Sequence, residues 1–140
     1  MAALTRIQPI THQGPVRDIA SRPVLAGMKI FKGALLGITS AGFARPFATG
    51  DKMGGHAQDT CDNKDGGNGA VSVDSYRGTY TLSLPSFDDV VVGDTGSGVK
   101  AVSDNHADLV KASGTTDVVG TVSGVGPNGV QVTFRTFEVA

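Results

Sequence analysis

Apolar and polar residues alternate over short stretches of this chain, and glycines separate one stretch from the next. The alternation is clearest in residues 71–73, 80–84 and 130–134, where every second residue is apolar. A period of two places the apolar side chains on one face of a half-buried β-strand. Arg77-Gly78 predicts a turn between the first two of these strands. Asn128-Gly129 predicts a hairpin turn before the third, because that pair adopts positive φ readily.

The rest of the chain contains further short segments of the same kind. Pro46 predicts that residues 43–47 lie at a sheet edge or a strand end, because proline lacks the N–H that a central strand needs. The valines at 90–92 predict a buried strand end, whereas 107–112 fits either a strand or one helical turn. Strands are also predicted over 27–33, 34–39, 53–58, 99–102 and 118–125. Short strands at this spacing, with no long amphipathic helix, predict an all-β domain, a small β-barrel or a sandwich.

The first 23 residues lack this pattern and predict an extended N-terminal arm in front of a β-domain at 24–140. Prolines and a glycine break any helix there, and the apolar residues share no single face. The arm is either a frayed terminus or a segment that becomes ordered on a partner by adding a strand to an exposed edge. The recurrence of apolar residues favours the second interpretation. The predicted contact residues of the arm are Ile7, Pro9, Ile10, Val16, Arg17, Ile19 and Arg22.

Composition narrows the classes of partner. The chain has 140 residues, which fits one domain, and its 20 glycines fit a fold with many turns. A net charge of −1 and the absence of tryptophan favour neither nucleic acid nor an anionic membrane as a direct partner. Cys61 is the only cysteine, so no intrachain disulfide framework is possible. Without a signal-peptide pattern or a long apolar run, we expect synthesis in a cytoplasm.

Asp94-Thr95-Gly96-Ser97 is the motif that most resembles a catalytic one. Small aspartic proteases carry Asp-Thr-Gly and dimerise so that two aspartates share one proton. Here Gly93 precedes the aspartate where that class has an apolar strand, and the supporting apolar-apolar-glycine element at 118–120 follows too soon. The motif therefore predicts a turn rich in Asp, Gly and Ser, with a dimeric aspartic protease as a remote alternative.

No other motif predicts a catalytic, cofactor or metal site. The acidic segment 59–69 resembles a calcium loop, but an EF-hand alignment on Gly66 places Cys61 and Ser72 where carboxylates are required. It predicts an exposed, mobile loop instead. His12, His56 and His106 show no metal-ligand spacing, although His56 and Cys61 are close enough in sequence to meet. The chain is therefore predicted to be a non-enzyme that needs no cofactor.

The order of elements over residues 27–140 resembles the head decoration, or capsid cement, proteins of tailed bacteriophages, of the lambda type. Residues 33–46 resemble their opening of glycine, apolar strand, short turn, aromatic residue and proline. Residues 56–66 resemble the loop after their returning strand, and 71–80 the strand that ends in an Arg-Gly-aromatic turn. Residues 118–122 with 129–135 resemble their closing hairpin. These motifs are patterns of turns and apolar residues rather than chemical signatures.

The resemblance implies a small β-barrel or β-tulip-like fold and an arm that becomes ordered on the capsid. It implies a virion protein on the outer capsid surface that binds the major capsid protein and bridges its neighbouring subunits against internal DNA pressure. A homo-oligomer is expected, with a trimer favoured over a dimer. The alternative from the residues alone is a carbohydrate- or cell-surface-binding β module displayed on a virion, with residues 59–69 as its candidate face.

Overall fold

The computed structural model describes residues 4, 5, 7, 11–13, 18–114, 117–127 and 129–137. Within these ranges the chain contains β-strands and two 3-10 turns but no α-helix, so the all-β prediction is confirmed. No helix in the described part is long and apolar enough to cross a membrane. The strands form four antiparallel sheets rather than one closed barrel. The first elements are β1 Thr11–Gln13, β2 Asp18–Pro23, β3 Lys29–Ile30, β4 Leu35–Ile38, β5 Ala44–Pro46, β6 Lys52–His56 and β7 Cys61–Asp62. The later ones are β8 Ser72–Arg77, β9 Thr79–Leu84, η1 Val92–Asp94, β10 Gly98–Lys100, η2 His106–Asp108, β11 Val110–Lys111, β12 Val118–Gly126 and β13 Gly129–Arg135.

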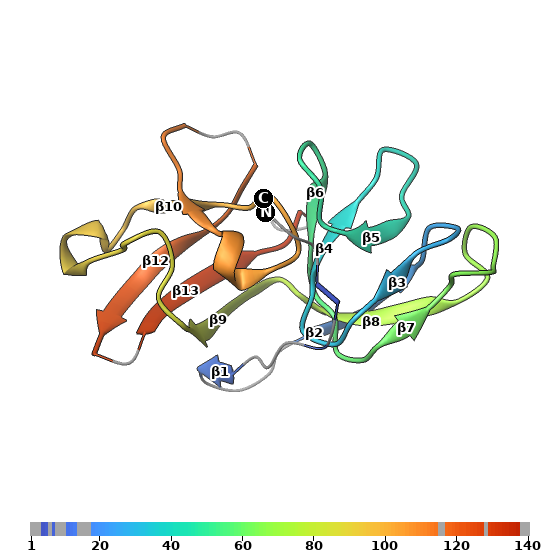
Figure 1. Ribbon diagram of the computed structural model, residues 1–140, viewed down its shortest axis with the longest axis horizontal. Coiled ribbons are helices and arrows are strands. Elements are labelled where there is room, and N and C mark those ends of the chain that lie inside the picture. Colours follow the sequence, from blue (N-terminus) through green and yellow to red (C-terminus); the bar gives the residue numbers. More distant parts are fainter. Residues whose placement is uncertain are drawn as a thin grey trace.

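The largest sheet has six strands in the order β1-β9-β13-β12-β10-β11 and occupies one half of the elongated molecule (Figure 1). Its centre is the predicted hairpin of β12 and β13, in which Val122 lies opposite Val132. A register shift between Val122 and Gly124 bends the hairpin. The side chains of Val130, Val132 and Phe134 are all buried, as their alternation predicts.

The other half of the molecule contains three small sheets, β5-β4-β6, β2-β8 and β3-β7. β5 lies at the edge of its sheet, as Pro46 predicts. β8 and β9 follow each other with only Gly78 between them, yet β8 pairs with β2 and β9 pairs with β13. Gly78 has φ +86° and lets the chain cross from one sheet to the next instead of closing a hairpin.

Two apolar clusters form the core, and β4 separates them. Leu35 belongs to the larger cluster, which lies against the six-stranded sheet. Leu36 and Ile38 belong to the smaller cluster, which includes Val24, Ile30 and Val73. Because β4 has apolar neighbours on both faces, all four of its residues are buried.

One expectation about exposure is wrong, and another holds with one exception. In the valine run only Val90 is buried, while Val91 and Val92 are 59% and 71% exposed. The run does not continue a strand, because the chain turns into η1 there. The segment 59–69 is mostly exposed, but it contains β7, and Asn63 within it is buried. The Asn63 amide donates to the carbonyl oxygens of Val24, Leu25 and Gly67, so this side chain organises the loop from inside. Residues 107–112 contain parts of both predicted alternatives, η2 and β11.

Two segments of the predicted arm pair with the strands of the β-domain. β1 pairs antiparallel with β9, with Thr11 opposite Ser83. β2 pairs with β8 over six positions, from Asp18 opposite Arg77 to Pro23 opposite Ser72. In the described part of the chain, both are outermost strands of their sheets. The arm thus does add strands to sheet edges, and here the edges are those of its own domain.

Candidate interaction surfaces

The predicted contact residues of the arm differ in accessibility. Ile7 and Ile19 are 56% and 45% exposed, and β2 presents Ile19 at a sheet edge. Arg22 is buried instead, with its Nε donating to Ser75 Oγ at 3.3 Å and its guanidinium 5.2 Å from the centre of the Phe137 ring. Arg22 therefore joins the arm to the domain. Pro9, Ile10, Val16 and Arg17 lie outside the described residues.

The N-terminal end of the arm contacts the loop before η2. The backbone N–H of Leu4 donates to Asp104 Oδ1 at 2.9 Å, and the Leu4 side chain packs on the smaller core cluster. Burial raises the pKa of Asp104, while the hydrogen bond from Leu4 acts in the opposite direction. A buried carboxylate thus holds the start of the arm against the domain.

The second surface is an apolar tip at one end of the long axis, formed by residues 88–94 and called here the valine tip. In Figure 1 it includes the short coil of η1 at the far left, at the opposite end from β3 and β7. Val91 and Val92 have their side chains in solvent, next to the exposed Asp88 and Asp89. The tip therefore exposes apolar valines beside two acids, while its third acid, Asp94, lies 3.5 Å from Lys111 Nζ.

Internal hydrogen bonds fix the shape of the valine tip. Asp94 Oδ2 accepts from the Val91 N–H at 2.8 Å, and Asp88 Oδ2 accepts from the Lys111 N–H at 2.8 Å. Asp88 and Asp89 have φ +46° and +51°, a left-handed conformation that is uncommon outside glycine. Such a conformation costs about 1–3 kcal/mol and persists only where its surroundings enforce it. Buried Val90 anchors the tip to the larger core cluster.

The third surface is a cleft with a volume of about 620 Å³ where the two halves of the molecule meet, called here the seam cleft. β12 and β13 form one wall and the start of β6 contributes to the other. Val118 and Phe137 are among the residues that line it, and they are 37% and 43% exposed. The cations at the cleft are the exposed Lys52 and Arg135, and Lys52 Nζ lies 5.6 Å from the centre of the Phe137 ring.

The acids of the seam cleft are largely committed to local contacts. Asp51 forms an ion pair with Arg45 at 2.7 Å and has only 4% of its side chain exposed. Asp117 Oδ1 accepts from the Gly50 N–H at 2.8 Å. This hydrogen bond ties the loop before β6 to the residue before β12. Two exposed cations against one carboxylate outside an ion pair give the cleft a slight positive excess.

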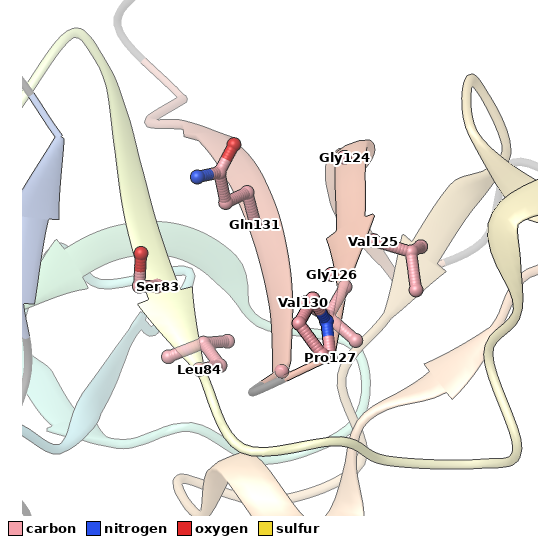
Figure 2. Close-up of a pocket in the computed structure, with 9 residues that line it drawn as sticks. Ser83, Leu84, Gly124, Val125, Gly126, Pro127, Val130 and Gln131 are labelled. Carbon is pink, nitrogen blue, oxygen red and sulfur yellow. The ribbon is translucent and has the colours of Figure 1, made fainter.

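A smaller groove of about 330 Å³ lies beside the turn of the β12–β13 hairpin. Figure 2 shows Ser83 and Leu84 of β9 on one side and Gln131 of β13 next to them. Gly124 and Gly126 of β12 leave backbone exposed there. The groove offers a few polar atoms and a short apolar surface, and its shape suits an extended segment more than a reaction centre.

Aromatic and histidine rings meet in the core, which the sequence did not indicate. His56 Nδ1 lies 2.7 Å from the Tyr80 hydroxyl, and the His56 ring centre is 5.4 Å from that of His106 and 4.6 Å from that of Phe134. Burial lowers the pKa of His106 from 6.5 to about 4 and raises that of Tyr80 well above its ordinary value. Cys61, which is close enough to His56 in sequence to meet it, is not part of this cluster. His56 and His106 are 50 positions apart in the sequence, so no local motif could indicate this cluster of rings.

The other candidate chemical residues have structural roles. Asp94 accepts a hydrogen bond within its own turn and lies 3.5 Å from Lys111 Nζ, as the turn interpretation of its motif predicts. Burial raises the pKa of the Cys61 thiol, which makes it less reactive. Among the described residues, no three histidine, cysteine or acidic side chains are grouped as a metal site would need.

The fold is similar to that of a solved structure, the N base of the head fiber gp8.5 in bacteriophage phi29. The likeness covers 85% of this chain and 94% of that chain, with a TM-score of 0.51 and 15% sequence identity. At this identity the comparison shows a shared fold. No protein-family model and no curated protein matches the chain.

Proposed function

We propose that this protein is a structural component of a phage virion that sits on the outside of the head and bridges neighbouring major capsid subunits. The observation that carries the proposal is the shared fold with the N base of a phage head fiber, which extends over 85% of this chain. The surfaces described above support it, because they are suited to contact rather than to chemistry. The protein acts as a homo-oligomer, with a trimer favoured over a dimer.

The arm is the proposed capsid contact. β1 and β2 show that segments of the arm already pair with sheet edges through main-chain hydrogen bonds. Strand addition of this kind depends little on side-chain identity, so it suits attachment to an exposed capsid edge. Ile7 and Ile19 are the accessible apolar side chains described in the arm. Several linked arms raise the effective concentration at the shell, so weak single contacts sum to tight binding.

A truncation tests the role of the arm, and the structure decides where to cut. Deletion of residues 1–23 would remove β2 and uncover β8, so loss of binding could reflect loss of the fold. Deletion of residues 1–17 keeps β2 and Arg22 in place. The control is deletion of residues 1–3, which keeps all the predicted contact residues.

The measurement is cosedimentation with empty shells assembled from the major capsid protein encoded in the same genome. The full chain and the control should sediment with the shells and raise the temperature at which they fall apart. The 1–17 deletion also removes β1 and the contact of Leu4 with Asp104, so it should stay in the supernatant while circular dichroism still shows a folded β-domain. Equal binding by this deletion would remove residues 1–17 from the proposal and leave only the part of the arm in β2. Failure of the full chain to bind would overturn the proposed function itself.

A further inference from the structure

We infer that the valine tip of one copy of this chain docks into the seam cleft of a second copy. The inference rests on the homo-oligomeric assembly proposed above and names the surfaces that form it. It starts from the exposed pair Val91 and Val92, two large apolar side chains adjacent in sequence and 59% and 71% in solvent. Scattered exposed apolar residues are ordinary, whereas a contiguous pair on a fixed protrusion marks a contact surface.

The tip is held ready for contact before any partner arrives. The Asp94 carboxylate and the Thr95 hydroxyl bond to the backbone of the two valines, at 2.8 Å each. The left-handed Asp88 and Asp89 lie within a turn that is closed by the hydrogen bond from the Val90 N–H to the Phe87 carbonyl oxygen, and Asp88 also accepts from the Lys111 N–H. Little conformational entropy therefore remains to be lost on docking, which favours affinity. Local backbone strain of this kind is common at binding sites.

The seam cleft complements the valine tip in its size, its apolar lining and its charge. Its volume of about 620 Å³ can admit a short turn, and Val118 and Phe137 supply apolar surface within it. Its exposed cations Lys52 and Arg135 match the exposed acids Asp88 and Asp89 beside the valines. Opposite charges around an apolar centre set the orientation of a contact and disfavour the reverse pairing.

The two surfaces are different patches of one chain, so the contact can either be made twice across a two-fold axis or be heterologous. A heterologous contact joins copies head to tail and closes into a ring when its rotation permits. In Figure 1 the tip lies at the end of the long axis, while the strands that line the cleft meet nearer the middle. Each copy can thus offer a tip to one neighbour and a cleft to the other. This arrangement is compatible with a closed trimer, and equally with a two-fold dimer in which the contact is made twice.

The first test measures the oligomeric mass of the full chain by light scattering during size exclusion, across a dilution series. Replacing both valines, Val91→Ser with Val92→Ser, should raise the dissociation constant by about tenfold or more for each valine removed. Lys52→Glu should also weaken assembly, and its matched control, Lys64→Glu in the exposed loop at the other end of the molecule, should not. A wild-type monomer at every concentration overturns the inference. So does an oligomer that the valine double variant leaves unchanged, although the proposed capsid role could still stand.

The second test places the contact directly. In a Cys61→Ser background, chains carrying Val92→Cys are mixed with chains carrying Val118→Cys and oxidised. The mixture should give a disulfide-linked dimer that neither variant gives alone. A matched mixture of Val92→Cys with Lys64→Cys should give none. Equal crosslinking in both mixtures, or none in the first despite oligomers in solution, contradicts the docking. Cosedimentation with capsid shells, measured separately, reports on the proposed function.

Discussion

Acidification should destabilise this protein through His106, which lies in the core near the His56 ring. The His106 side chain is 7% exposed, and burial lowers its pKa from 6.5 to about 4. The folded protein therefore holds fewer protons than the unfolded chain between these two values. The free energy of unfolding is unaffected by this group above the unfolded pKa of 6.5. It falls as the pH drops through the window and reaches its full loss below about 4.

The size of the effect follows from the same two values. One pKa unit corresponds to about 1.36 kcal/mol, so the change from 6.5 to about 4 corresponds to a loss of about 3 kcal/mol. Screening by solvent reduces this little, because the ring is almost fully buried. Asp104 acts in the opposite direction: its folded pKa is raised above 3.8, so its protonation at low pH favours the folded state. The net loss should therefore level off at the acid end of the range.

Urea unfolding between about pH 7.5 and about pH 4 measures the slope, with the His106→Gln variant as the comparison. The variant should start less stable, because it loses the ring contact with His56, but its stability should change less over this range. Asp104→Asn should steepen the loss at the acid end, since it removes the compensating group. Parallel curves for wild type and His106→Gln would refute the assignment of the pH dependence to His106.

Two further substitutions test the local structure, each against a control from the same segment or type. Asn63→Ala should lower the free energy of unfolding by about 2–3 kcal/mol in urea melts, because three backbone carbonyls lose their buried donor. The control, Asn68→Ala at an exposed position, should lower it by less than about 1 kcal/mol. Similar losses for the two variants would show that Asn63 does not organise the loop. Gly55→Ala should cost more than about 2 kcal/mol in thermal melts, because Gly55 has φ +98° and an added Cβ would meet the Tyr76 carbonyl oxygen. Gly67→Ala, which meets nothing within 4 Å, should stay within about 0.5 kcal/mol, and an equally small effect at Gly55 would contradict the close approach.

The sequence was sufficient to predict those features of the fold that depend on the residues of a single segment. Alternation identified the buried faces of β9 and β13, and Pro46 identified an edge strand, because both signals depend on the residues of one segment. Alternation gives the face of a strand but not its partner. The turn at Gly78 was predicted, but the pattern did not show that β8 and β9 enter different sheets. The partners of β8 and β9 are β2 and β13, which lie far from them in the sequence.

The seam cleft could not be predicted, because it is assembled from distant segments. The seam cleft combines the start of β6 with β12 and the end of β13. The valine tip was missed for a different reason: a run of apolar residues predicts burial, and nothing in the run itself shows which member leaves the core. The carboxylate of Asp94, three residues after Val91, turns the chain outward at that point. That aspartate had drawn attention as a protease-like motif, and its role in the turn could be recognised only from the hydrogen bond.

The acid-sensitive core and the seam cleft share one strand, which connects the pH prediction to the proposed assembly. β6 begins with Lys52 in the cleft and ends with His56 beside Tyr80 and Phe134. Phe134 in turn lies on β13, three residues before Phe137, whose N–H donates to the Met53 carbonyl oxygen at 3.0 Å. A charge forced onto His106 next to His56 would strain the two strands that shape the cleft. Assembly through the cleft should therefore weaken at the pH where the core loses stability, and contacts made by the arm alone should persist to lower pH.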